Sequence, residues 1–149
     1  MGFLIRDHAH LSCLTTANMF RKSFDKLRKA AAQSIDEAMA AKMRRDEKAY
    51  LAALRKALAL EREAADMAPD EGTRAELNLS STVLAFNCAE FDLATELATA
   101  ALVGAPEWVR RNVRVLRALI DSSRKAAALK VRSSTGASYG MATAPNYRR

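Results

Sequence analysis

The chain has 149 residues, of which half are apolar and 6% aromatic, and its five glycines and three prolines are too few for a turn-rich β protein. Its frequent alanine, leucine, arginine and glutamate residues favour helices, so we expect one all-α domain. The charge is uneven: residues 1–105 hold 14 Lys/Arg and 15 Asp/Glu (net −1), whereas residues 106–149 hold 10 and 2 (net +8). This asymmetry indicates a charged partner rather than a particular fold.

The sequence shows no targeting segment and no metal motif. No apolar run approaches the roughly 18 residues of a membrane-spanning helix, and charges from Arg6 onward interrupt the apolar start of the chain. His8, His10 and Cys13 lack a fourth ligand, and Cys88 lies in an apolar run, which predicts a buried thiol in a reducing compartment. We therefore expect a cytoplasmic protein with no cofactor.

The N-terminal third is predicted to be helical after a flexible start. Residues 1–16 have no clear periodicity, and Met19 is a second candidate start. A basic amphipathic helix is predicted from Ala17 to about Gln33; its basic side is either a solvated face or a surface for a membrane or an acidic partner. Ser34–Glu37 has the form of a capping box, so a helix either restarts there and runs to Arg45 or continues through it.

Two helices are predicted before the middle of the chain. Asp46 can cap a helix over Glu47–Met67, which the turn at Pro69–Gly72 ends. Thr73–Glu76 has the form of a capping box that opens a central helix running to about Cys88. This helix carries no charge from Leu77 onward, which predicts neighbours on most of its sides.

The second half of the domain is predicted to contain a return helix, a longer final helix and a tail. Ala89–Phe91 should form a tight turn before a helix over Asp92–Val103, with Gly104 as its C-cap and Pro106 opening the next helix. That final helix should run from Glu107 to about Lys130, and residues 131–149 should form a disordered basic tail. Its buried stripe is expected to contain Val109, Val113, Leu116, Ile120 and Ala127, widened by Val115 and Leu119.

Two of these helices share a spacing of aromatic and small residues. The pattern Phe91-x-x-Ala94-x-x-x-Ala98-x-x-Ala101-x-x-x-x-Pro106 is matched in part by Tyr50-x-x-Ala53-x-x-x-Ala57, 41 positions earlier. It resembles the second helix of a tetratricopeptide (TPR) unit, and the helix from Glu107 resembles the helix that closes TPR arrays. The resemblance covers roughly residues 34–130, within a single domain over residues 17–130, and implies antiparallel helical hairpins that bind another protein. A three-helix microtubule-interacting-and-transport-like bundle is a similar alternative.

The function expected from these features is a non-catalytic scaffold or adaptor. The sequence contains no phosphate-binding loop, no nucleophile motif and no acid paired with a base, so we do not expect an enzyme. An acidic protein segment could bind the basic row of the last helix; nucleic-acid binding through the same row and the tail is the alternative. Self-association of the acidic middle with this row stays open, and a membrane partner is not expected. The predicted basic surface consists of Arg110, Arg111, Arg114, Arg117, Arg124 and Lys125.

Overall fold

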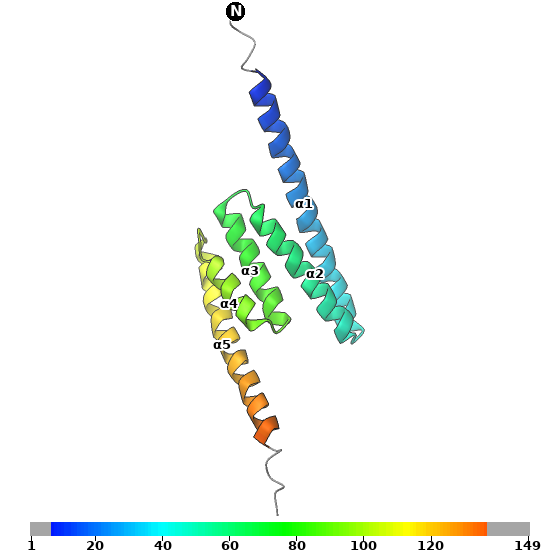
Figure 1. Cartoon of the computed structure of the whole chain (residues 1–149), viewed down its shortest axis with the longest axis vertical. Coiled ribbons are helices and arrows are strands. Elements are labelled where there is room, and N and C mark those ends of the chain that lie inside the picture. Colours follow the sequence, from blue (N-terminus) through cyan, green and yellow to red (C-terminus); the bar gives the residue numbers. More distant parts are fainter. Residues whose placement is uncertain (1–6, 137–149) are drawn as a thin grey trace, which may run out of the picture.

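The computed structural model describes the backbone of residues 7–136 and the side chains of residues 18–131. Over these residues it contains five α-helices and no strand, which confirms the expected all-α fold. Each helix runs antiparallel to the one before it (Figure 1). Most of the expected tail lies outside the described residues. The helices are α1 (Asp7–Met43), α2 (Glu47–Asp66), α3 (Glu71–Asn87), α4 (Phe91–Ala100) and α5 (Glu107–Gly136).

The helices pack mainly on their neighbours in the sequence. α2 lies between α1 and α3, and α5 contacts both α3 and α4 (Figure 1). The central position of α3 agrees with the absence of charge from Leu77 onward, because this part of the helix lies between neighbours. α1 and α5 extend past the other helices at opposite ends of the molecule (Figure 1).

α1 is longer than expected and passes through Ser34 without a break. It begins at Asp7 rather than Ala17 and ends at Met43. The Ser34 side chain is fully buried, and its hydroxyl donates a hydrogen bond to the Ala30 carbonyl at 3.0 Å. A serine that bonds back to its own helix in this way does not cap a new one, so the helix continues.

Aspartates cap the next two helices. Asp46 Oδ1 accepts a hydrogen bond from the Ala49 amide at 3.0 Å, which confirms the predicted cap of α2. The predicted capping box at Thr73 was wrong, because α3 begins earlier and Asp70 is its N-cap. Asp70 Oδ1 accepts from the Thr73 amide at 2.7 Å, and the Thr73 hydroxyl donates to Asp70 Oδ2 at 2.8 Å. These bonds hold the pKa of the Asp70 carboxyl below its usual value.

Small side chains allow the helices to approach closely. Three of the four alanines of the repeated spacing are buried: Ala57, Ala94 and Ala98 are each 0% exposed, whereas Ala53 is half-buried. One cluster of buried residues receives side chains from all five helices, including Ala38 of α1 and Ile120 of α5. This cluster therefore links all five helices, and Cys88 lies within it, as predicted.

The turns around α4 use left-handed backbone. Ala89, between α3 and α4, has φ 60°, and Gly104, between α4 and α5, has φ 63°. α4 ends at Ala100 rather than Val103. A Cβ atom added to Gly104 would lie 2.5 Å from the Glu71 Cβ, so the turn before α5 lies directly against the start of α3. Only glycine fits both the conformation and the space at this position.

Candidate interaction surface

The six predicted basic residues lie on α5, and the structure divides them into two groups. Arg117 and Arg124 contact α4 through hydrogen bonds. The other four side chains are exposed and form no hydrogen bond or ion pair with any described residue. Those four are Arg110, Arg111, Arg114 and Lys125.

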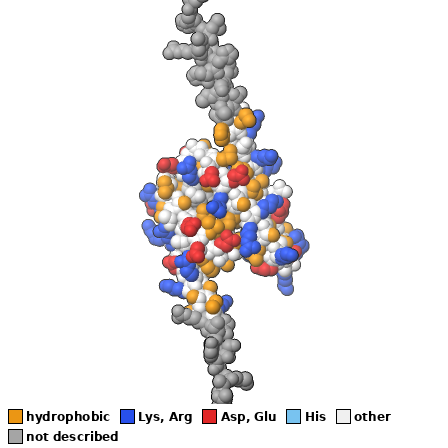
Figure 2. All heavy atoms as spheres, viewed as in Figure 1, with side chains coloured by type: hydrophobic (Ala, Val, Ile, Leu, Met, Phe, Trp, Pro, Cys, Tyr) orange, Lys and Arg blue, Asp and Glu red, His pale blue; other side chains and the backbone are white. Residues whose placement is uncertain are grey.

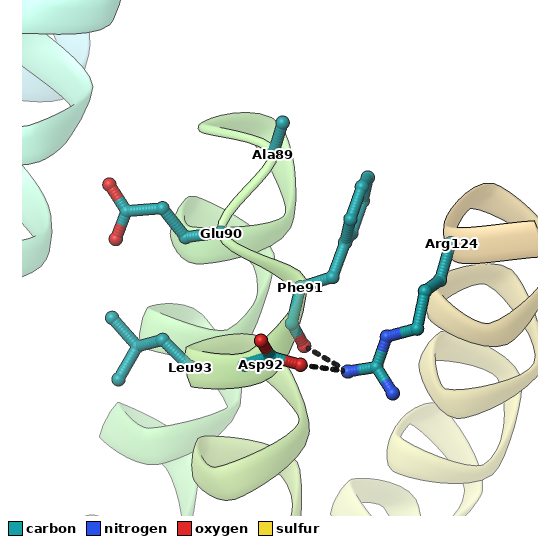
Figure 3. Close-up of a pocket in the computed structure, with 6 residues that line it drawn as sticks. All are labelled: Ala89, Glu90, Phe91, Asp92, Leu93 and Arg124. Atoms are coloured by element: carbon teal, nitrogen blue, oxygen red, sulfur yellow. Dashed lines mark hydrogen bonds and ion pairs between the residues drawn. The ribbon is translucent and has the colours of Figure 1, made fainter. Parts of the chain in front are cut away.

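Arg124 attaches α5 to the first turn of α4. Its Nη2 donates to the Phe91 carbonyl at 3.2 Å and pairs with Asp92 Oδ1 at 2.7 Å (Figure 3). The same Nη2 also donates to Thr95 Oγ1 at 3.2 Å. The Asp92 side chain is 95% exposed, so the charge of this pair is well screened by water. The shared contact with a backbone carbonyl and a hydroxyl fixes where the guanidinium lies. Arg124 is therefore a helix-packing residue.

Helix geometry explains why only some of the basic residues of α5 contact α4. Arg110, Arg117 and Arg124 are seven residues apart, and an α-helix drifts about 20° around its axis over seven residues. Each successive arginine thus lies nearer to α4, and Arg117 Nη2 already reaches Thr99 Oγ1 at 2.8 Å. α4 ends at Ala100, so Arg110 lies beyond its end. The N-terminal half of the row therefore stays available to a partner.

A second stripe of α5 is apolar and exposed. Val115 and Leu119 were expected to widen the buried stripe, but they are 58% and 47% exposed, so this prediction was wrong. The neighbours of α5 cover the side that carries Val109, Val113 and Ile120, which are buried. Positions 115 and 119 lie roughly 140° and 100° around the helix from that side, where no described helix packs.

Trp108 belongs to the same exposed stripe. Its side chain is 48% exposed at the first turn of α5. Trp108, Asn112, Val115 and Leu119 follow one another at four-, three- and four-residue steps, which places them on one face. This spacing is visible in the sequence. From the sequence alone, however, an apolar stripe beside a buried one is interpreted as the edge of a broad buried face.

The basic side of α1 forms a second charged region. On the face shown in Figure 2, Lys and Arg side chains gather towards both sides of the molecule, with acidic and apolar side chains between them. Met19 and Phe20 are 68% and 63% exposed, whereas Phe24 and Leu27 pack against α2 and α3. The exposed basic residues of this region are Arg21, Lys22, Lys26, Arg28 and Lys29.

A carboxyl group of α2 is buried, and Arg28 of α1 lies near enough to act on its charge. Glu61 of α2 is 5% exposed, and its Oε2 has no hydrogen-bond partner; the buried Ser81 Oγ of α3 also has none. Burial raises the pKa of Glu61, and the positive charge of Arg28 opposes this effect in part.

The hollow at the α3–α4 turn has no group free to bind a ligand. It is lined by Ala89–Leu93 and Arg124 and has a volume of about 350 Å³ (Figure 3). The Arg124 guanidinium is already bonded to α4, and the Glu90 carboxylate pairs with Arg55 at 3.2 Å. The hollow is therefore a by-product of the way α5 crosses α4.

Other kinds of site are not found in the described part of the chain. No group of three or more His, Cys, Asp or Glu side chains that could hold a metal ion occurs among the described residues. None of the described helices combines the length and apolarity that a bilayer crossing requires. Burial raises the pKa of the Cys88 thiol, so it is a poor nucleophile.

Comparisons with known proteins do not assign the chain to a family. No family model, curated protein or solved structure matches it. Inferences about function therefore rest on the chemistry of its surface, and above all on α5.

Proposed function

We propose that the protein is a non-catalytic interaction module, a scaffold or adaptor, whose α5 binds an acidic segment of another protein. One observation carries the proposal: the unpaired arginines of α5 lie beside exposed Trp108 and Val115. Charged side chains alone are typical of any solvated face, but large apolar side chains beside them are typical of binding surfaces. α5 is also held from behind by α3 and α4, so little order would be lost on binding.

The TPR-like resemblance is part of this proposal. Two antiparallel helix pairs followed by a single helix is the order that the resemblance implies. The fully buried Ala57 of α2 and Ala98 of α4 occupy matching positions of the repeated spacing, 41 residues apart. These features support a module built from helical hairpins, a class of protein that commonly binds other proteins.

Charge reversal on α5 tests the proposal. We expect a triple variant, Arg110→Glu, Arg111→Glu and Arg114→Glu, to lose its partner in affinity capture from the native cell, because an acidic segment would then be repelled. All three residues are exposed and unpaired, so the variant should keep its helical circular dichroism spectrum.

A matched control carries the same change of charge elsewhere. Arg44, Lys48 and Arg62 are exposed and lie on or between α1 and α2. Their replacement by glutamate should leave partner capture intact. Recovery of the same partner by both triple variants would contradict the proposal.

Nucleic-acid binding is the second candidate function. It is favoured by the four unpaired basic side chains of α5, which could contact successive phosphates. Binding of a random oligonucleotide should then weaken steeply with salt, and the α5 triple variant should abolish it. Tight, salt-sensitive binding of the oligonucleotide by the control triple variant, together with its loss in the α5 triple variant, would favour nucleic-acid binding over the adaptor function.

A further inference from the structure

α5 presents a strip of exposed large apolar side chains that are spaced along most of its length, with Asn112 between the first two. The strip consists of Trp108, Val115, Leu119 and Leu129, which are 48%, 58%, 47% and 66% exposed. Ser122 and Ala126 fall between the last two at the same alternating three- and four-residue steps. From Trp108 to Leu129 the strip is about 30 Å long, because an α-helix rises about 1.5 Å per residue.

The spacing of the strip suits another helix. An apolar line with alternating three- and four-residue steps, which winds slowly around the helix, is the pattern through which two α-helices supercoil around each other. A partner helix of about 20 residues would match its length. Addition of a peptide strand would instead need an exposed strand edge, and none exists in the described part of the chain.

The border of the strip is basic. Arg111 lies three residues after Trp108 and four before Val115, so its side chain starts between them on the helix surface. Arg114 and Lys125 continue this border, and neither forms an ion pair with a described residue. A partner helix with acidic residues flanking its apolar stripe would place carboxylates opposite these cations.

The same charges argue against a second copy of α5 as the partner. Between Glu107 and Val131 the helix carries seven Lys or Arg residues and two acids, a net +5. Two such helices placed side by side would repel each other along their whole contact. An acidic helix is attracted by the same charges, so charge complementarity selects between the two occupants.

We propose that the apolar strip of α5 is the docking site for an acidic amphipathic helix of another protein. This proposal rests on the function proposed above and specifies the partner's chemistry. The apolar side chains of the two helices interdigitate along the strip, and glutamates or aspartates of the partner pair with Arg111, Arg114 and Lys125.

Trp108 makes the proposal directly measurable. It is the only tryptophan of the chain, so the intrinsic tryptophan fluorescence of the full-length protein reports on the strip itself. We expect a synthetic helical peptide of about 20 residues, with leucines at alternating three- and four-residue steps and glutamates beside them, to shift this emission to shorter wavelength as the indole leaves water. A peptide with lysines in place of the glutamates should leave the emission unchanged, and so should a glutamate peptide whose helix is broken by two prolines.

Variants separate the apolar and ionic parts of the site. Leu119→Glu should weaken binding of the glutamate peptide about tenfold or more, as expected for a central apolar contact. Arg111→Glu combined with Arg114→Glu should also weaken it, and should in addition let the lysine peptide bind. Val103→Glu is the matched control, since Val103 is 64% exposed but lies outside α5.

Several results would overturn the proposal. These are an unchanged emission with the glutamate peptide, equal binding of the lysine peptide, no loss with Leu119→Glu, or a dimer in sedimentation equilibrium that Leu119→Glu dissociates. If partner capture depends on the α5 arginines while the glutamate peptide leaves the emission unchanged, the interaction function stands and the helix-docking inference fails. If partner capture does not depend on them either, both proposals fail.

Discussion

Ala89 adopts a backbone conformation that an L-residue disfavours. Its φ of 60° places its Cβ close to the following carbonyl oxygen, which costs about 1–2 kcal/mol relative to right-handed backbone. The conformation persists because Glu90 N, one residue further on, must reach the Ala85 carbonyl at 3.0 Å to close α3.

Ala89→Gly should therefore stabilise the fold. We expect the free energy of unfolding in urea to rise by roughly 1 kcal/mol, because glycine removes the strain but makes the unfolded chain more flexible. Ala59→Gly, at an exposed position within α2, is the matched control and should lower stability by about 1 kcal/mol. Equal losses in both variants would show that the turn at Ala89 is not strained.

Glu61 makes the stability of the fold depend on pH. Its folded-state pKa is raised above the usual value of 4.5, because burial disfavours the charged carboxylate. Below pH 4.5 the group is protonated in both the folded and the unfolded chain and adds no cost. As the pH rises through the folded-state pKa, the folded protein must accept a buried charge, so stability is lost in that window.

Glu61→Gln removes this ionisation while keeping the shape of the side chain. We expect the variant to be more stable than the wild type at pH 7, by on the order of 1 kcal/mol, and the difference to shrink towards pH 4. Urea unfolding at a series of pH values measures it, with the exposed Glu63→Gln as control. If Glu61→Gln is instead less stable than the wild type at pH 7, the attraction between the Glu61 carboxylate and Arg28 outweighs the cost of burying the charge.

At the scale of the helix, α5 depends on few polar contacts with α4. α4 has only ten residues, and Arg124 reaches its first turn while Arg117 reaches its last. Beyond Arg124 the described side chains of α5 are exposed, so this arginine marks the end of its packed part.

Arg124→Ala should loosen the second half of α5. We expect amide protection against hydrogen exchange to fall from about Leu116 onward, and the free energy of unfolding to fall by about 1 kcal/mol, as for the loss of a hydrogen-bonded group. Lys125→Ala is the control: the residue is adjacent, exposed and unpaired. If both variants exchange alike, the contacts of Arg124 with α4 do not hold the helix.

Composition and periodicity were sufficient to predict five to six helical segments, but Ala127, which was expected in the buried stripe of the last helix, is exposed. The predicted start of α3 was misplaced because Asp70 and Thr73 can both cap a helix. The sequence does not show which of their side-chain oxygens accepts a hydrogen bond from a backbone amide of the first turn. The restart at Ser34 was left open for the same reason, since a buried serine hydroxyl can bond backwards as well as forwards.

The candidate surface was predicted only in part. Periodicity correctly placed the basic residues on one side of α5, but it did not show which of them α4 would bind, because that depends on where the shorter helix ends. The exposure of Val115 and Leu119 depends on how many helices pack against α5, a property of the tertiary fold.

For the whole molecule, unequal helix lengths decide which parts are packed. α1 has 37 residues and its partner α2 has 20, so the first part of α1 extends beyond α2 (Figure 1). The exposure of Met19 and Phe20 marks the point where the packed part of α1 begins.

A chain that begins at Met19 should therefore be as stable as the full chain, within about 0.5 kcal/mol in urea unfolding, as for other changes away from the core. A chain that begins at Lys29 should lose roughly 2 kcal/mol or more, because it lacks Phe24 and Leu27, which pack against α2 and α3. Equal stability of the two shortened chains would contradict the packing of α1.

The burial of Cys88 has a practical consequence. Its thiol lies in the cluster that all five helices share, and its pKa is raised, so an alkylating reagent cannot react with it while the helices remain together. The rate at which such a reagent modifies Cys88 therefore measures how frequently the packing around the α3–α4 turn opens. Alkylation of Cys88 thus reports on transient opening of the helix packing without any introduced label.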